Sequence, residues 1–234
     1  MSTVRAISFD LDDTLWDLAP VLTAAEQRTY AWLVARVPAL SDRYDLSGLR
    51  DVRLQLLHTQ PDLRHQITAL RRAGVETALR ELGLPAGEAA HLADGALEEF
   101  LRARHAVRYF DGALEVLAAL QPRYVLGSLT NGNACPRRLG LDRYFSFSFS
   151  AEQLNASKPA PDLFRAAMAA AGVKAAELLH VGDHIEHDIE AAKLLGARAI
   201  WLNRAGQPWP GHRATPDATI GDLRELPAAI ARLD

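Results

Sequence analysis

The chain has 234 residues, a formal net charge of −3 and one cysteine. This length allows one large or two modest domains with a buried core. The mixture of acidic and basic residues gives no reason to expect a nucleic acid or an anionic membrane as partner. One cysteine excludes an intrachain disulfide and an all-cysteine metal site. No apolar run has the length of a signal peptide or of a membrane span. We therefore expect a soluble, cytoplasmic protein.

The first predicted element is a short buried strand, residues 4–9, which leads directly into three acidic residues, Asp10, Asp12 and Asp13. In an open α/β sheet, ligands bind beyond the carboxyl ends of the strands. Side chains alternate along an extended chain, so Asp10 and Asp12 lie on the same side. Two carboxylates held this close need a cation or a shared proton. For this stretch taken alone, a solvated acidic turn is the simpler alternative.

A long helical block follows this strand. Apolar residues recur at helical spacing over residues 19–37, 45–58, 67–82 and 85–105. Gly83 ends the third of these predicted helices. No strand-like alternation occurs within the block. We therefore expect an all-helical cap domain, residues 17–106, inserted directly after the first strand.

The second half of the chain alternates between predicted helices and strands. Helices are predicted over residues 112–120, 161–172 and 186–195, and strands over residues 124–129, 145–149, 178–181, 199–202 and 218–220. This alternation predicts a parallel sheet that is covered by helices on both faces. The first strand must join this sheet. The expected fold class is therefore α/β, with a Rossmann-like core made of residues 1–16 and 107–234.

Polar residues suited to phosphate chemistry follow several of these strands. Thr130 ends the second strand, Lys158 lies in a proline-rich loop, Asp183 ends a later strand, and Asp188 follows it. Taken singly, they read as a turn hydroxyl, a solvated lysine, a helix N-cap and a first-turn acid. In a parallel sheet, however, all of these positions converge on one edge. The coincidence favours a single site shared with the acids after the first strand.

Four segments resemble, in chain order, the motifs of the haloacid dehalogenase-like hydrolase superfamily. Residues 9–15 (Phe-Asp-Leu-Asp-Asp-Thr-Leu) and 128–132 (Ser-Leu-Thr-Asn-Gly) look like its first and second motifs. Residues 157–159 (Ser-Lys-Pro) and 181–188 (Val-Gly-Asp-His-Ile-Glu-His-Asp) look like the third and fourth. The resemblance spans essentially the whole chain, including a helical cap between the first two motifs. It implies a Mg²⁺-dependent phosphatase.

The resemblance also implies a role for each motif residue. Asp10 is the implied nucleophile, which forms an aspartyl-phosphate, and Asp12 is the implied general acid and base. Thr130 and Lys158 are implied to hold the phosphoryl oxygens, together with backbone N–H groups near Asn131. The implied magnesium residues are Asp10, Asp12 through its backbone carbonyl, Asp183, and Asp188 as a ligand through water or an orienting residue.

Residues 130–134, 140–145 and 179–183 look like a subgroup that includes phosphatases of flavin biosynthesis. That similarity implies a small-molecule phosphate ester as substrate, with flavin mononucleotide (FMN) and 5-amino-6-(5-phospho-D-ribitylamino)uracil as candidates. Trp16 is expected at the mouth of the site, with packing between cap and core as the alternative. Arg71 is expected to reach a substrate phosphate or polar group, with a solvated helix face as the alternative. We expect a monomer or a homodimer.

Several alternatives are weighed against this hypothesis. A 2-haloacid dehalogenase of the same fold lacks an acid two residues after the nucleophile, so Asp12 favours phosphate-ester hydrolysis. A phosphosugar mutase usually has glycine where Asp13 stands. A receiver-like signalling module carries its phosphorylated aspartate later, in a shorter chain, whereas Asp10 directly follows the first strand here. A non-catalytic phosphate-binding protein does not require the full set of catalytic residues, whereas this chain has all of them. His180, His184 and His187 raise the alternative of a transition-metal site.

Overall fold

The computed structural model describes residues 3–211 and 213–233. The chain divides into two compact units. One unit joins Met1–Asp17 to Arg108–Asp234, and the other is Leu18–Val107. Within the described part of the chain, no helix has the length and hydropathy needed to cross a membrane.

The first unit is built on a parallel sheet of six strands in the order β3-β2-β1-β4-β5-β6. The strands are β1 (Ala6–Phe9), β2 (Val125–Thr130), β3 (Phe147–Ser150), β4 (Leu178–Gly182), β5 (Arg198–Leu202) and β6 (Ala218–Ile220). The predicted α/β fold is confirmed. Strand order reverses where β1 lies between β2 and β4, and such switch points form crevices at the carboxyl ends of the strands.

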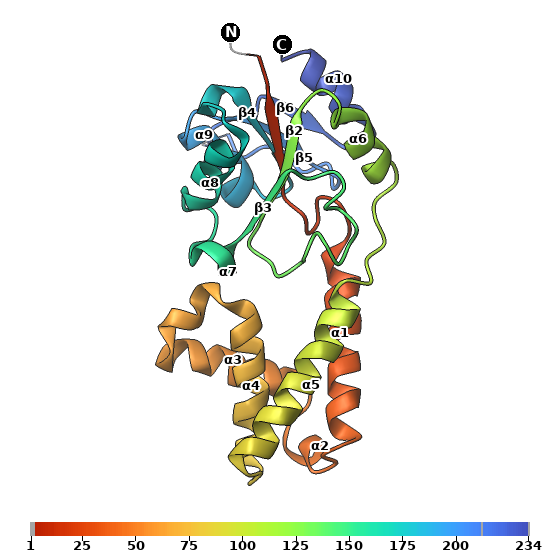
Figure 1. Ribbon diagram of the computed structural model, residues 1–234, viewed down its shortest axis with the longest axis vertical. Helices are drawn as coiled ribbons and strands as arrows, with labels where there is room; N and C mark the ends of the chain where they lie inside the picture. The colour runs from red at the N-terminus through yellow and green to blue at the C-terminus, as the bar shows by residue number, and fades with distance from the viewer. Residues whose placement is uncertain (1–2, 212, 234) are drawn as a thin grey trace. The chain divides into compact units, whose positions relative to one another are not determined.

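Helices cover both faces of this sheet. They are α6 (Ala113–Leu120), α7 (Ala151–Leu154), α8 (Asp162–Ala171), α9 (Ala191–Leu194) and α10 (Leu226–Ala231). Figure 1 shows α8 and α9 on one side of the sheet and α6 and α10 on the other. All four residues of β1 are buried, as expected for a central strand of a parallel sheet with both faces covered.

A glycine in β2 makes room for one aromatic ring of the core. Gly127 pairs with Phe147 of β3, and a Cβ atom at position 127 would lie 2.1 Å from the Phe147 ring. The Phe147 side chain packs in a cluster with Leu129 of β2 and with Leu163 and Phe164 of α8. Gly127 therefore lets the sheet and α8 pack tightly beside the strand ends.

The second unit consists of helices. They are α1 (Leu18–Val34), α2 (Leu40–Arg43), α3 (Leu46–Thr59), α4 (Ile67–Glu81) and α5 (Ala86–Arg104), with a 3₁₀ turn at Pro61–His65. Helix α5 packs against α1 and α4, and α4 packs against α3. The core of this unit includes Leu33, Leu79 and Ala96, all completely buried. Helix α1 ends at Val34, three residues before the predicted end.

Candidate active site

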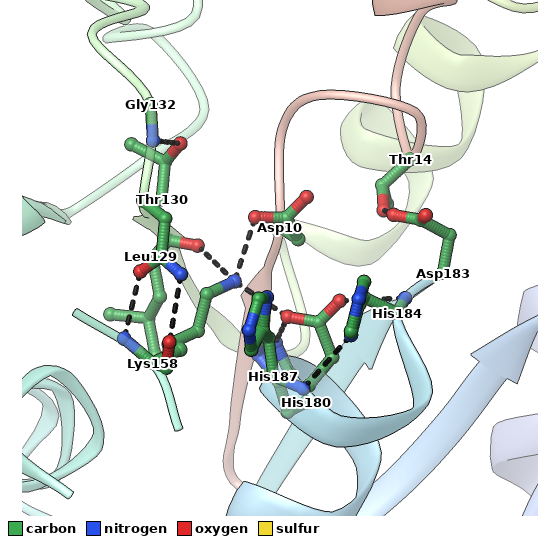
Figure 2. Close-up of polar contacts among 12 residues, drawn as sticks. Asp10, Thr14, Leu129, Thr130, Gly132, Lys158, His180, Asp183, His184 and His187 are labelled. Carbon is green, nitrogen blue, oxygen red and sulfur yellow. Dashed lines mark hydrogen bonds and ion pairs between the residues drawn. The ribbon is translucent and has the colours of Figure 1, made fainter. Parts of the chain in front are cut away.

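The carboxyl edge of the sheet brings Asp10, Lys158 and Asp188 together, and Figure 2 shows Lys158 pointing toward Asp10. The Nζ atom of Lys158 donates to Oδ1 of Asp10 at 2.7 Å and to Oδ1 of Asp188 at 2.5 Å. It also donates to the main-chain carbonyl of Leu129, at the end of β2, at 2.9 Å. The Lys158 side chain is only 2% exposed. One buried ammonium group thus joins three segments that lie far apart in the chain.

The charges in this cluster do not balance. Burial alone would lower the pKa of Lys158, but the carboxylates of Asp10 and Asp188 outweigh burial and raise it. Burial favours a higher pKa for Asp188, but Lys158 and His180 hold the pKa of this carboxyl well below its usual range. Burial raises the pKa of Asp10, and the neighbouring acids Asp188 and Asp183 add to this effect. One lysine therefore does not fully stabilise the charged form of Asp10.

A third carboxylate completes an oxygen-rich group. Asp10, Asp183 and Asp188 each offer an oxygen, and these three atoms lie within 4.8 Å of one another. Burial, with the charge of Asp188, raises the pKa of Asp183 to about 7. The Thr14 hydroxyl donates to Oδ1 of Asp183 at 3.0 Å. Carboxylate oxygens are the ligands that Mg²⁺ prefers, and a cation would stabilise the charged forms of Asp10 and Asp183. The donor set therefore fits a magnesium ion.

Asp188 is held by more than the lysine. Its Oδ1 atom also lies 3.1 Å from Nε2 of His180, and its Oδ2 atom accepts from the His184 N–H at 3.0 Å. The predicted helix 186–195 is wrong in its first half, because Ile185–Glu190 forms a π-helical turn before α9 begins. Gly182 leaves room for Asp188, since a Cβ at position 182 would lie 2.4 Å from the carboxyl carbon.

Two residues, His180 and Ser8, help to hold Asp188 through hydrogen bonds that were not predicted from the sequence. His180 of β4 and Ser8 of β1 are completely buried and pair across the two strands. The Ser8 hydroxyl lies 2.8 Å from Nδ1 of His180. Burial lowers the pKa of His180, which favours a neutral ring. A neutral ring that donates from Nε2 to Asp188 accepts from Ser8 at Nδ1. Paired polar residues inside two otherwise apolar strands are the signal that could have revealed this contact.

The residues that end β2 shape the loop around Lys158. The Oγ1 atom of Thr130 accepts a hydrogen bond from the Gly132 N–H at 2.9 Å, so this hydroxyl also stabilises the turn after β2. The Asn131 side chain accepts from the Lys158 N–H at 2.8 Å and donates to the Lys158 carbonyl at 2.9 Å. Asn131 therefore fixes the main chain that carries the lysine. Figure 2 shows Thr130 beside the loop that carries Lys158, and the two hydrogen bonds place Asn131 next to the lysine.

A cavity of about 330 Å³ lies beside Thr130. Hydroxyl groups line it, because Ser128 and Thr130 of β2 pair in register with Ser148 and Ser150 of β3, and all four residues border the cavity. The Ser128 hydroxyl is buried and has no hydrogen-bond partner within the described chain. Buried hydroxyls usually have a partner, so this cavity suits a polar guest.

Trp16, which we expected at the mouth of the site with packing as the alternative, lies in the interior of the first unit. Its side chain is completely buried, and its indole Nε1 donates to Oδ1 of Asp12 at 2.9 Å. The ring packs edge-on against Tyr109. Burial of a large aromatic surface is favourable when the indole N–H has a partner, as it has here. The Trp16 ring therefore offers no exposed face to a ligand.

Arg71 lies on α4 in the helical unit. It donates to Oε1 of Glu26 at 3.4 Å, and its guanidinium carbon lies 3.6 Å from the centre of the Phe100 ring. Burial, reinforced by the neighbouring charge of Arg53, lowers the pKa of Arg71 to about 9. The expected contact of Arg71 with a substrate stays a prediction.

At the switch point of the parallel sheet, a lysine bridges two buried aspartates, and a third carboxylate lies beside them. This arrangement fits a hydrolase of the class that the motifs indicate. Residues 4–196 match the family model described as haloacid dehalogenase-like hydrolase. The chain belongs to this family, and the predicted resemblance is confirmed.

Two of the similar proteins match over nearly the full length of the chain, and a third matches over about two thirds of it. The chain is 31% identical over 234 residues to the 5-amino-6-(5-phospho-D-ribitylamino)uracil phosphatase YigB of Escherichia coli K12, covering 98% of each protein. It is 36% identical to a phosphoserine phosphatase of Thermus thermophilus, over 64% of this chain and 63% of that protein. Among solved structures, a 2-haloacid dehalogenase from Pseudomonas syringae pv. Tomato DC3000 is 42% identical, with a TM-score of 0.95 over 99% of this chain and 100% of that one.

Proposed function

We propose that this hydrolase is a Mg²⁺-dependent phosphatase that hydrolyses a small-molecule phosphomonoester through an aspartyl-phosphate on Asp10. The observation that carries the proposal is the Lys158 ammonium, buried between Asp10 and Asp188 at 2.7 and 2.5 Å. This lysine offsets the charge of Asp10 and supplies a cation for phosphoryl oxygens. The phosphatase relatives at 31% and 36% identity support the same reaction class.

The reaction takes two steps on these residues. In the first, an oxygen of Asp10 bonds to phosphorus as the ester P–O bond breaks, and Asp12 gives its proton to the leaving alkoxide. In the second, water bonds to phosphorus as the bond to Asp10 breaks, and Asp12 takes a proton from that water. Thr130 and Lys158 hold the phosphoryl oxygens in both steps. Asp188 keeps Lys158 in place through the 2.5 Å contact.

Asp10, the backbone carbonyl of Asp12, and Asp183 are the residues that would hold Mg²⁺, with Asp188 beside them. When bound, the ion neutralises negative charge between the carboxylates and the phosphate dianion. Burial raises the pKa values of Asp10 and Asp183, and the positive charge near them does not offset this rise. A bound cation would offset it, which supports the assignment.

For the substrate we propose a phosphate ester of a hydroxylated metabolite, with 5-amino-6-(5-phospho-D-ribitylamino)uracil and FMN as first candidates. Both carry a ribityl chain next to the phosphate. The cavity beside Thr130 supports a hydroxylated group, because Ser128, Ser148 and Ser150 line one part of it, while apolar side chains and Glu152 line other parts. The similarity to YigB, which spans 98% of both chains, supports the same choice.

A second candidate reaction is hydrolytic dehalogenation of a 2-haloacid. The observation that favours it is the 42% identity to the Pseudomonas syringae structure described as a 2-haloacid dehalogenase. Asp12 favours the phosphatase, because halide leaves without a proton whereas an alkoxide needs one.

The test measures phosphate release from ribitylaminouracil phosphate, FMN and simple phosphomonoesters, and chloride release from 2-chloropropionate, with Mg²⁺ and with chelator. We expect phosphate release that chelator abolishes and that Asp10→Asn reduces by at least about 10³-fold. Circular dichroism of Asp10→Asn checks that the variant is folded. Chloride release without phosphate release would contradict the proposal and establish the second candidate. A cytoplasmic location and a monomeric or homodimeric state stay predictions.

A further inference from the structure

The proposed reaction uses the carboxyl group of Asp12, but it assigns no role to the hydrogen bond between this group and the indole of Trp16. Nε1 of Trp16 donates to Oδ1 of Asp12 at 2.9 Å, and the Trp16 side chain is 0% exposed. An indole N–H can only donate, and a carboxyl group keeps an acceptor oxygen whether or not it carries a proton. The bond is therefore compatible with both steps, in which Asp12 first gives a proton and then takes one.

The indole itself is held by the main chain of the same unit. Trp16 forms isolated β-bridges with Asp12 and with Tyr109. Its ring lies edge-on to the Tyr109 ring, with centroids 5.8 Å apart and an interplanar angle of 77°. The Tyr109 hydroxyl donates to the carbonyl of Leu139 at 2.8 Å. A buried ring packed in this way cannot turn without losing several contacts.

We propose that Trp16 is a positioning residue, which fixes the orientation of the Asp12 carboxyl group for proton transfer to the leaving-group oxygen. The inference rests on the proposed function, since it concerns the general acid of that reaction. The terminal torsion of an aspartate is otherwise broad, and proton transfer requires the donor within hydrogen-bond reach of the acceptor. A fixed N–H donor on Oδ1 removes that freedom.

The test exploits leaving groups that differ in their need for a proton. Trp16→Phe removes the N–H and keeps an aromatic ring. We expect single-turnover cleavage of an alkyl phosphate to slow by ~10- to 100-fold, because small misplacements of a catalytic group carry costs of this size. Cleavage of 4-nitrophenyl phosphate should change by less than about threefold, since 4-nitrophenolate leaves without protonation. Equal loss on both substrates, or no loss on the alkyl ester, would overturn the inference.

Two further variants separate positioning from packing. Tyr109→Phe keeps the ring against Trp16 and loses only the bond to Leu139, so it should show no dependence on the leaving group. In an Asp12→Asn background, adding Trp16→Phe should cost less than about twofold, because both changes act on one proton transfer. Independent, multiplying losses would mean that Trp16 acts on something other than Asp12.

A spectroscopic readout does not depend on turnover. The chain has four tryptophans, so the indole ¹⁵N–¹H resonance of Trp16 is the one missing from Trp16→Phe. We expect this resonance to move in Asp12→Ala while the other three stay in place; an unmoved resonance would show that the bond is absent. If the wild-type protein releases no phosphate, the proposed function fails and the inference fails with it. If the wild-type protein releases phosphate and Trp16→Phe changes the cleavage rates of both esters by the same factor, only the inference fails.

Discussion

Each unit of the molecule has a cation paired with carboxylates, and Lys158 and Arg71 differ in their partners and in their burial. Lys158 in the first unit has two carboxylates of its own, at 2.7 and 2.5 Å. Arg71 in the helical unit shares the single carboxylate of Glu26 with Arg53, at 3.4 and 3.0 Å. Coulombic attraction to its carboxylates raises the pKa of Lys158 despite burial, whereas burial and Arg53 lower the pKa of Arg71 to about 9.

The difference shows what each cation does. Around Lys158 the acids outnumber the cation, so the group is incomplete without further positive charge, as expected of a site that takes up a metal ion. Arg71 lies flat against Phe100 at 3.6 Å, and its side chain is 17% exposed. An arginine placed on an aromatic face contributes through packing as well as charge. The excess of acids over the buried cation therefore marks the Lys158 cluster as the candidate catalytic group, whereas around Arg71 two arginines outnumber one acid.

The largest expected effect is that of Lys158→Met. Removing the ammonium leaves Asp10 and Asp188 buried without their shared partner, so we expect a loss of about 3–5 kcal/mol in the free energy of unfolding. Turnover should fall by at least about 10²-fold. Urea denaturation and phosphate release measure the two effects.

The matched control for this variant is Lys193→Met. Lys193 also donates to a carboxylate, that of Asp217 at 2.8 Å, but both side chains of this pair are about a quarter exposed. A pair open to solvent should contribute less than about 1 kcal/mol. Similar losses for the two lysine variants would show that the buried contacts of Lys158 contribute no more to stability than a solvent-exposed ion pair.

A smaller effect concerns pH. The pKa of Asp183 is about 7 in the folded protein, against an ordinary value of 3.8. A raised folded-state pKa stabilises the fold fully below the unfolded pKa, and this contribution is lost as pH rises through the folded pKa. Without Mg²⁺, the free energy of unfolding should therefore fall between about pH 4 and pH 8. Asp183→Asn should remove much of this slope and be about 1–3 kcal/mol more stable than wild type at pH 8.

Denaturation at several pH values in chelator checks this expectation. Asp10, whose pKa is also raised by burial, contributes a slope of the same sign. Asp188 contributes the opposite sign, but only in strong acid, because its pKa is held well below its usual range. Saturating Mg²⁺ should flatten the slope in the wild-type protein. An unchanged slope in Asp183→Asn would contradict the assignment of Asp183 as a carboxylate short of positive charge.

The smallest expected effect is that of Arg71→Met. Glu26 keeps Arg53 at 3.0 Å, and the methionine stem still covers Phe100. The free energy of unfolding should fall by about 1 kcal/mol, from the lost cation–π contact and one weak ion pair. Steady-state kinetics on the preferred ester tests the substrate contact predicted for Arg71. A rise in KM would support that contact, and an unchanged KM would leave Arg71 as a packing residue.

Much of the fold was predictable because its signals are local. Short apolar runs predicted most of the six strands, and alternation of Phe and Ser predicted the strand at residues 145–149. The predicted family and hydrolase class are confirmed. Helices α2 and α7 were missed because each has four residues, too few to show a helical period. The π-helical turn was missed because its geometry depends on Asp188 meeting the His184 N–H, a contact that apolar spacing does not report.

The site was predictable only in part, for a similar reason. Asp10 was chosen from its position after a strand, Asp188 from its position just past one, and Lys158 from its proline-rich loop, and the structure brings the three together. The support from Ser8 and His180 comes from inside the strands, where sequence reasoning looked only for apolar residues. Trp16 was expected at the mouth of the site because it lies just past the first motif, and a hydrogen bond to Asp12 and packing on Tyr109 hold its ring.

The insertion of the helical unit after β1 also sets an order of events during protein synthesis. β1 pairs with β2 and β4, and both follow Leu18–Val107 in the chain. At roughly 5–20 residues per second, β1 leaves the ribosome about ten seconds before its first partner strand. During that interval an apolar strand stays unpaired, available to chaperones or to aggregation. Asp10, the proposed nucleophile, is thus among the first residues made, and its surroundings are completed only when Asp188, late in the chain, has been translated.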